Sequence, residues 1–129
     1  MTDTARGEPV SLKLRGRTLA VPQAARGVSR FSFAELCEQA HGAGDYLALA
    51  ENFHTLVLDG IPRMSREQRN EAHRFSTLID ALYEHRVRLI CAADAPPDEL
   101  YVAGTHSRAF KRTASRLIEM QSADYLRPR

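Results

Sequence analysis

The sequence has little of what disulfide-rich, membrane-spanning and metal-binding proteins need. Its 129 residues contain no tryptophan and two cysteines, Cys37 and Cys91, which belong to no Cys-x-x-Cys pair. Two cysteines in a chain of this length make no disulfide framework, so we expect a reducing compartment. The sequence also has no signal peptide and no apolar run near transmembrane length. These absences predict a cytoplasmic protein without a membrane span.

Neither sign of charge is in large excess. The net charge of +2 does not by itself indicate nucleic acid or an acidic membrane as a partner. Lysine is scarce: of the 18 lysine and arginine residues, Lys13 and Lys111 are the only lysines and the rest are arginines. Genome base composition would explain this bias. The guanidinium fork also suits carboxylates and phosphates, so individual arginines merit inspection.

Several signatures of catalysis and cofactor binding are missing from the sequence. It has no G-x-x-x-x-G-K-[ST] loop, no G-x-G-x-x-G fingerprint, no H-E-x-x-H and no G-x-S-x-G elbow. The histidines show no ligand spacing with cysteines or carboxylates, so we expect surface or hydrogen-bonded roles and no metal site. These histidines are His41, His54, His73, His85 and His106.

The N-terminal third has the pattern of antiparallel β-structure. We expect one domain over residues 1–129, with residues 1–8 disordered. Apolar residues alternate on both sides of Gly16, which predicts a β-hairpin; they are Val10, Leu12, Leu14, Leu19 and Val21. Phe31 and Phe33 then alternate with polar residues, which predicts a third strand leading into a short helical turn. A short helix follows, with Asp45 as its expected N-cap.

The middle of the chain predicts a parallel β-α-β unit. We expect strands over residues 54–59 and 87–92, with a helix over 65–85 between them that begins at a Ser65–Gln68 capping box. A crossover of this length favours parallel strands. A last helix is expected over about 110–121. The predicted fold class is therefore α/β, with a parallel β-α-β unit, an N-terminal antiparallel β-hairpin and a C-terminal helix.

Among the acidic residues, Asp59 and Asp94 have the positions most typical of a ligand-binding site. Each is expected just beyond an apolar strand of the β-α-β unit, where ligands gather in open α/β sheets. Two carboxylates at that edge would hold Mg²⁺ or act as acid and base. The alternative is a role as caps and turn formers, which we favour because Asp59 precedes Gly60.

Arginines on two helices form the other candidate group. Arg112 and Arg116 are one turn apart in the predicted last helix, and like charges at that spacing repel. Arg116 has Glu119 within helical reach, whereas Arg112 has no acidic residue at three or four positions on either side. Arg74 lies on the long helix, where Asp80 is available for a surface ion pair.

Four blocks of sequence, in order, resemble the C-terminal part of the ZapE/AFG-like family of P-loop, AAA+-like ATPases. They are FSFAELC, GAGDYLALAENFHTLVLDGIPRMS, HRFSTLIDALYEHRVRLICAADAPPDELY and RTASRLIEMQSADYL. The resemblance covers about residues 10–126. The family pattern ARRF falls on residues 72–75, with His73 replacing its first arginine and Arg74 matching the second. The pattern R-x-x-S-R-L-x-E-M matches residues 112–120 in full.

The resemblance implies a function that this chain does not complete alone. The family's Walker A phosphate loop and acidic Mg²⁺ motif lie upstream of the matched part, so ATP and Mg²⁺ are implied for the full-length protein and this chain by itself should not hydrolyse ATP. Implied partners are the upstream ATPase core, a neighbouring copy in a homo-oligomer, and a cell-division protein. Organellar relatives are linked to protein quality control. ATPases of this class use downstream arginines at the phosphates, so the candidate catalytic residues are Arg112, Arg116 and Arg74.

Two other interpretations remain open at this stage. In the first, the chain is a non-enzymatic module that binds a protein through the edge of the hairpin or through the basic residues of 105–129. The same basic residues would also suit nucleic acid, which is the less expected partner. Alternatively, both arginines of the last helix are structural and hold it to the domain through a carboxylate such as Asp80.

Overall fold

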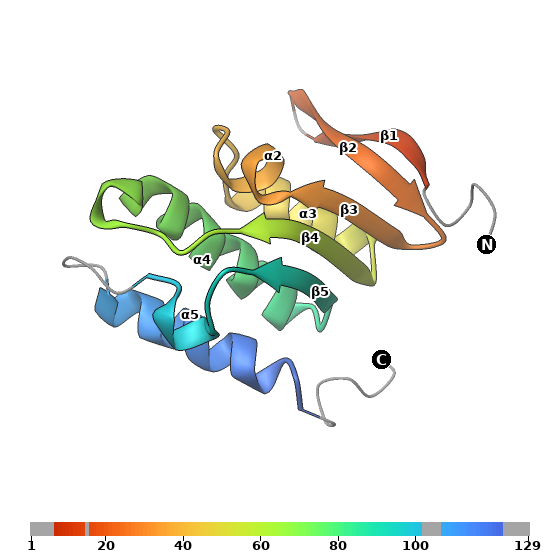
Figure 1. The fold of residues 1–129 in the computed structure, drawn as a ribbon. Helices are drawn as coiled ribbons and strands as arrows, with labels where there is room; N and C mark the ends of the chain where they lie inside the picture. The colour runs from red at the N-terminus through yellow and green to blue at the C-terminus, as the bar shows by residue number, and fades with distance from the viewer. Residues whose placement is uncertain (1–6, 15, 102–106, 123–129) are drawn as a thin grey trace.

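The computed structural model describes residues 7–14, 16–101 and 107–122. A five-stranded sheet has the order β1–β2–β3–β4–β5 (Figure 1). The strands are β1 (Glu8–Leu14), β2 (Arg17–Ala25), β3 (Val28–Ser32), β4 (Thr55–Ile61) and β5 (Arg88–Ala93). The helices are α2 (Phe33–Cys37), α3 (Ala43–Asn52), α4 (Arg69–Glu84) and α5 (Ser107–Glu119), with 3₁₀ turns η1 (Arg66–Gln68) and η2 (Pro97–Glu99).

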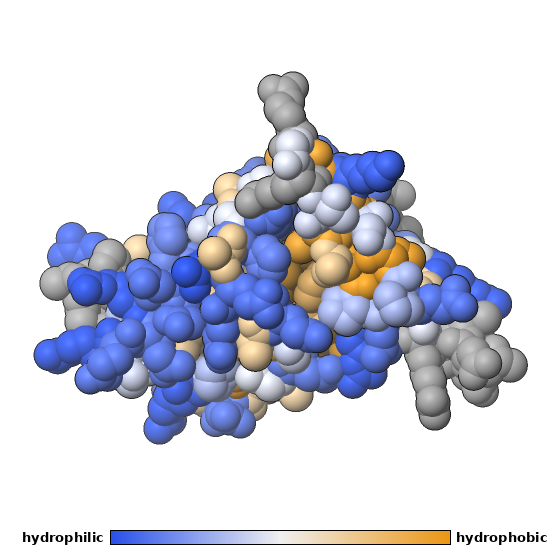
Figure 2. Space-filling model, turned by 90° about the horizontal axis from the view of Figure 1, so that it is seen from above, coloured by the Kyte–Doolittle hydropathy of each residue, from blue (hydrophilic) through white to orange (hydrophobic). Residues whose placement is uncertain are grey.

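The predicted hairpin is confirmed. Strands β1 and β2 pair antiparallel with Leu12 opposite Leu19, and Gly16 in the turn has a φ of 80°. Most of residues 1–8, expected to be disordered, lie outside the described part of the chain. Glu8, however, is the first residue of β1 and pairs with Ala24, so the strand begins before Val10. Figure 2, which is seen from above, shows a group of hydrophobic residues on this face of the molecule.

The parallel β-α-β unit is also confirmed. Strand β4 pairs parallel with β5, and α4 connects them. The Ser65 N–H donates to Oε1 of Gln68 at 2.9 Å, as a capping box requires, although this box caps the 3₁₀ turn η1 that leads into α4. Strand β4 runs on through Asp59 and Gly60 to Ile61 because Gly60, with a φ of 73°, allows a bulge opposite β5.

Two local predictions were wrong by a few residues. Phe33 starts α2 rather than continuing β3, because Ser32 and Glu35 form a capping box with bonds of 2.8 and 3.1 Å. The N-cap of α3 is Gly42, not Asp45. The Asp45 carboxylate, three residues into the helix, accepts from the Gly42 N–H at 2.8 Å, so it caps the helix from the first turn.

The core lies between the sheet and α4. Figure 1 shows α3 and α4 on the same side of the sheet and α5 beside α4 at the β5 end. The sheet contributes Phe31, Leu56 and Leu58, all at most 2% exposed. Helix α4 contributes Phe75, whose ring is 6.0 Å from that of Phe33 and 6.1 Å from that of Phe110. Phe75 therefore links the sheet layer, α2 and α5 in one packed cluster.

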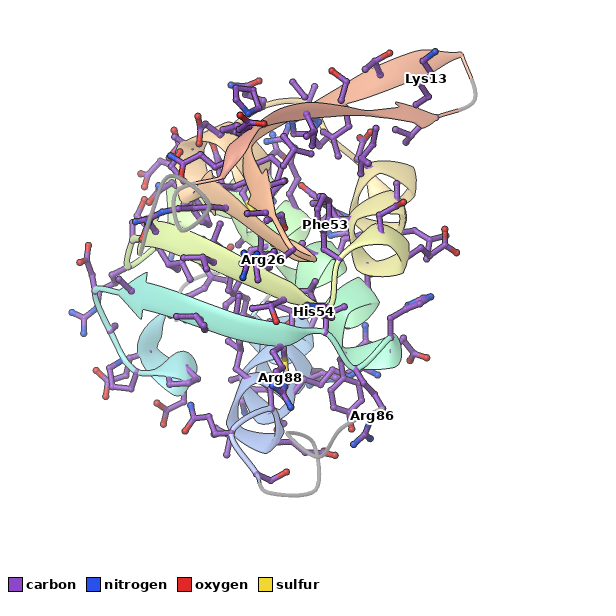
Figure 3. The ribbon with its side chains drawn as sticks, turned by 90° about the vertical axis from the view of Figure 1, so that its right-hand side faces the viewer. Lys13, Arg26, Phe53, His54, Arg86 and Arg88 are labelled. Carbon is purple, nitrogen blue, oxygen red and sulfur yellow. The ribbon has the colours of Figure 1, made fainter. Side chains whose placement is uncertain are left out.

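His54 closes the end of the sheet against the turn between β2 and β3. Its backbone N–H donates to the Gly27 carbonyl at 2.9 Å, and its ring Nε2 donates to the Arg26 carbonyl at 3.1 Å. The labelled Arg26 and His54 lie at this end in Figure 3. A Cβ at Gly27 would be 2.5 Å from the His54 ring, and the φ of Gly27 is 83°. Gly27 is therefore required both for its conformation and for its lack of a side chain.

We predict that Gly27→Ala destabilises the fold more than the matched change Gly60→Ala. Gly60 has a φ of 73°, but no heavy atom lies within 4 Å of its added Cβ. Gly60→Ala should therefore cost only the left-handed conformation, about 1–2 kcal/mol. Gly27→Ala should cost at least about 1 kcal/mol more, because the His54 ring must move. Urea unfolding measures both variants, and equal losses would contradict the close-contact argument.

Candidate functional site

Helix α5 packs an apolar stripe on the body of the domain and turns a polar edge toward α4. Phe110, Ala114, Leu117 and Met120 are buried and recur at helical spacing. The Phe110 ring also meets Tyr101 edge-on, with ring centres 5.6 Å apart. Arg112 and Arg116 lie on the polar edge, so the two like charges that the sequence places one turn apart both face α4.

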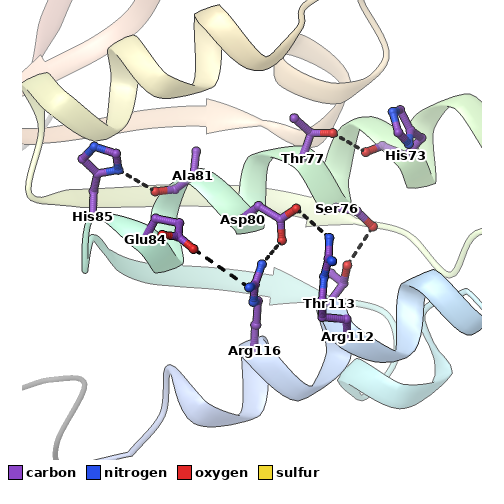
Figure 4. A network of polar contacts seen from close by, with 10 residues as sticks. All are labelled: His73, Ser76, Thr77, Asp80, Ala81, Glu84, His85, Arg112, Thr113 and Arg116. Atoms are coloured by element: carbon purple, nitrogen blue, oxygen red, sulfur yellow. Dashed lines mark hydrogen bonds and ion pairs between the residues drawn. The ribbon is translucent and has the colours of Figure 1, made fainter.

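Asp80 on α4 is the common partner of these two arginines (Figure 4). Arg112 Nη2 donates to Asp80 Oδ2 at 3.1 Å, and Arg116 Nη1 donates to Asp80 Oδ1. One carboxylate oxygen thus serves each guanidinium. The negative charge between them offsets the repulsion of two cations at i and i+4. The structure therefore supplies the acidic partner that the sequence near Arg112 lacks.

The two arginines differ in how far they are withdrawn from solvent. The Arg116 side chain is 22% exposed, whereas that of Arg112 is 65% exposed. The Arg116 guanidinium also lies 4.8 Å from the centre of the Tyr83 ring and 4.0 Å from Glu84 Oε2. Arg116 is accordingly a packing residue between α4 and α5. Arg112 makes its contact with Asp80 at the surface and keeps most of its side chain in solvent.

A second polar contact joins the helices one turn further along. The Thr113 hydroxyl donates to Ser76 Oγ at 2.8 Å, and Thr113 is 1% exposed. On α4 itself, the Thr77 hydroxyl donates to the His73 carbonyl at 3.0 Å. Glu119, which the sequence allows to pair with Arg116, is bonded by Tyr83, and this hydrogen bond raises the pKa of Tyr83. These contacts fix the register of α5 on α4.

Arg74 lies apart from this group. Its Nη1 donates to the carbonyl of Cys37 at 3.1 Å, at the end of α2, rather than pairing with Asp80 as the sequence allowed. A cation at a helix C-terminus satisfies a carbonyl that has no partner within the helix. The structure thus brings Arg112 and Arg116 together through Asp80 and places Arg74 at the junction of α2 and α4.

The thiol beside this junction is deeply buried. Cys37 is fully inaccessible, and burial raises the pKa of its thiol to about 12. The neighbouring Tyr46 hydroxyl donates to the Leu36 carbonyl at 2.9 Å, and burial raises its pKa as well. Both groups stay protonated at neutral pH. Cys91 on β5 is exposed, so the two cysteines have opposite accessibilities.

The carboxylates proposed for Mg²⁺ have other surroundings. Asp59 lies within β4 rather than beyond it and accepts from Arg30 Nε at 2.8 Å. The Asp94 N–H donates to the Ile61 carbonyl at 2.9 Å as the chain leaves β5. Among the residues that the structure describes, no cluster of three histidines, cysteines or carboxylates could hold a metal ion. Nor does any described helix have the length and apolarity to cross a membrane.

The basic C-terminal region is less available than its sequence suggests. Of its six basic residues, Arg127 and Arg129 lie outside the described part of the chain. Arg112 and Arg116 share Asp80, so their charge is partly compensated. Arg108 and Lys111 are exposed. The described part of α5 therefore offers a weaker basic surface than the count of cations predicts.

We predict that Arg116 contributes more to stability than Arg112. Arg116→Ala should lower the free energy of unfolding by about 1–2 kcal/mol, because it removes the half-buried ion pair, the contact with Tyr83 and the packed stem. Arg112→Ala should cost less than about 1 kcal/mol because that pair is exposed. Chemical denaturation gives both values, with the exposed Arg108→Ala on the same helix as the control.

A double-mutant cycle tests the shared partner. In an Asp80→Ala background, both arginine substitutions should cost less than they do in the parent chain, since the pair they would break is already absent. Fully additive losses would show that Asp80 does not couple to either arginine.

The cysteines should differ in reactivity. At pH 8 the native chain is expected to take up one iodoacetamide group, at Cys91, because Cys91 is accessible and Cys37 is not; burial raises the pKa of both thiols, so the reaction at Cys91 should be slow. In denaturant both should react. Mass spectrometry of intact and digested protein counts and locates the groups. Modification of Cys37 in the native chain at the rate of Cys91 would contradict this assignment.

The chain resembles known proteins in sequence over most of its length. Residues 1–129 match the family model of the AFG1-like ATPase. The chain is 38% identical to the cell division protein ZapE of Escherichia coli (strain K12), over 91% of this chain and 31% of that protein. It is 34% identical to lactation elevated protein 1 homolog B of Danio rerio, over 91% of this chain and 30% of that protein.

The match extends to only part of each relative. The chain spans about a third of the length of these curated relatives. No solved structure matches the chain. The family model, however, covers every residue, and both relatives align with nine tenths of the chain. The chain therefore belongs to the AFG1-like ATPase family.

Proposed function

We propose that this chain is the C-terminal portion of a cytoplasmic P-loop ATPase and contributes to ATP hydrolysis as part of the whole protein. The observation that carries the proposal is the match of residues 1–129 to the AFG1-like ATPase family, although the sequence has no phosphate loop. The residues described here do not fit an ATP–Mg²⁺ site, since no acidic or histidine cluster is available for the metal. We therefore assign nucleotide binding to other parts of the family protein.

Arg112 is the residue that we propose to act at the phosphates. Its side chain is 65% exposed, and Asp80 orients it through one Nη atom. Phosphoryl transfer depends on positioning and on neutralising charge, which an oriented guanidinium supplies. Arg116 then has a positioning role, since it holds α5 in place through Asp80 and Tyr83. Arg74 has a similar supporting role between α2 and α4.

The proposed partners follow from this assignment. The exposed position of Arg112 suits a phosphate bound either by the ATPase core of the same protein or by a neighbouring copy in an oligomer. The printed name of the Escherichia coli relative, a cell division protein, supports a cell-division partner as a further proposal. A nucleic-acid role has weaker support, because Asp80 partly compensates the basic charge of α5.

The test is ATP turnover by a chimaera in which this chain replaces the matched segment of Escherichia coli ZapE. Arg112→Ala should lower kcat by about 10³-fold, the order of magnitude that an arginine at the transferred phosphoryl group supplies. Asp80→Ala is the comparison variant, because it removes the ion pairs of both Arg112 and Arg116 but keeps the two guanidinium groups. It should lower turnover much less.

Two results would decide against this role. Normal kcat in Arg112→Ala would rule out action at the phosphates. Equal losses in Arg112→Ala and Asp80→Ala, accompanied by equal losses in melting temperature, would assign Arg112 a structural role. Turnover of the parent chimaera is required in either case, and its absence would refute the proposed contribution to ATP hydrolysis.

A further inference from the structure

Among the described residues, strand β5 is an edge strand of the sheet without the usual protection of an edge. It pairs with β4 on one side, and no other described strand pairs with it. After Arg88 it reads LICAA, with no proline and no charge. Ile90 is 60% exposed, and Cys91, Ala92 and Ala93 are also exposed. Natural proteins blunt such edges with charges, prolines or covering elements, because an open apolar edge recruits another strand.

The backbone of β5 presents alternate residues to its open side. The Arg88 N–H donates to the His54 carbonyl at 2.9 Å, so Arg88 directs its backbone polar groups toward β4. In a parallel ladder this orientation alternates, which also turns Ile90 toward β4 and turns Leu89 and Cys91 away from it. The N–H and C=O groups of Leu89 and Cys91 are therefore the ones that a sixth strand would meet.

The helix layer extends further than the sheet at this edge. Figure 1 shows α5 beside α4 at the β5 end of the molecule. A cavity of about 140 Å³ lies between the two layers there. Its lining includes Leu89 and Cys91 of β5, Phe75 of α4, Leu117 of α5 and Met120 just after that helix. A strand added to β5 would direct every second side chain into this apolar cavity. The edge and the cavity are thus two observations that point to the same occupant.

In the described part of the chain, the opposite face of the parallel strands is also partly exposed. The side chains of Arg30 and Asp59, which pair there across β3 and β4, are 53% and 44% exposed. Parallel sheets occur almost only where both faces are covered, because their crossover helices pack on both sides. Here the described helices α3 and α4 lie on one side (Figure 1). Strands β3, β4 and β5 therefore have the form of part of a larger parallel sheet.

We propose that β5 continues into a sixth strand supplied by the ATPase part of the family protein, which places apolar side chains in the cavity beside α5. This inference rests on the proposed function. The curated relatives are about three times as long as this chain, so most of the family protein is available to supply the strand. The parallel direction of β3, β4 and β5 suits a phosphate-binding fold, whose loop follows a strand of a parallel sheet.

Amide hydrogen exchange, resolved to single residues, tests the pairing. The isolated chain is compared with the chimaera in which it replaces the matched segment of Escherichia coli ZapE. The Leu89 and Cys91 amides should exchange at least 100-fold more slowly in the chimaera. The Ile90 amide, bonded to β4 in both proteins, serves as the internal reference. Unchanged rates at Leu89 and Cys91 would overturn the proposal.

A pair of variants tests the cavity. Cys91→Asp puts a charge where the added strand would cover it, and should abolish the protection of Leu89 in the chimaera. Ile118→Asp is the matched control, since Ile118 is 56% exposed and does not line this cavity. Circular dichroism of both isolated variants verifies the fold. Retained protection in a folded Cys91→Asp chimaera would contradict the proposal.

Other occupants give different results. Protection of Leu89 and Cys91 in the isolated chain that rises with protein concentration, together with a dimer mass, would assign the edge to a second copy. Protection in the isolated chain that a variant ending at Ser122 loses would assign it to residues 123–129. Either result overturns the proposal. ATP turnover with unprotected edge amides would refute the pairing alone, whereas protected amides without turnover would refute only the proposed role in hydrolysis.

Discussion

The apolar face of α4 is the constraint on which the other elements depend. Phe75, Leu78 and Ile79 are inaccessible to solvent, and they belong to one core cluster with residues of the sheet and of the other helices. Burial of each such side chain contributes about 1.5–3 kcal/mol to the free energy of folding. Among the described helices, α4 buries the most residues along one face, so its total contribution is the largest. The crossover between β4 and β5 therefore sets where α2, α3 and α5 pack. Polar contacts adjust that packing but do not create it.

The charges on α5 are explained by this arrangement. Two arginines on one face of an isolated helix repel each other, and nothing within α5 compensates Arg112. Packing of α5 on α4 brings Asp80 between the two arginines. The ion pairs with Asp80 offset the repulsion within α5 and hold the two helices together. The same carboxylate leaves Arg112 mostly in solvent and draws Arg116 against Tyr83. The sequence already separates the two residues, because only Arg116 has an acidic residue within helical reach, and the structure adds a difference in exposure.

As far as the structure describes the chain, the sheet is well packed on its helical face and partly exposed on its other face and at the β5 edge. Family membership and the short span relative to the curated relatives are consistent with that asymmetry. Three features of the described residues show this exposure: the apolar edge strand β5, the cavity beside it, and the partly exposed face of the parallel strands. They have one physical origin, because parallel strands need side-chain contacts on both faces and backbone partners on both edges.

The sequence by itself determined the element types and their order, because strand and helix periods, glycine turns and capping residues are local signals. Its errors were local too: Ser32 ends β3 by capping α2, and Gly42 takes the N-cap that Asp45 was expected to hold. The sequence offered Asp80 as one possible partner of Arg112 and Arg116, but only the tertiary structure decided that both of them bind it and that Arg74 does not. Asp80 is 32 residues from Arg112, and the Cys37 carbonyl is 37 residues from Arg74, so packing rather than spacing brings them together. The open edge of β5 was likewise decided by the fold, since a strand's neighbours depend on topology and not on its own residues.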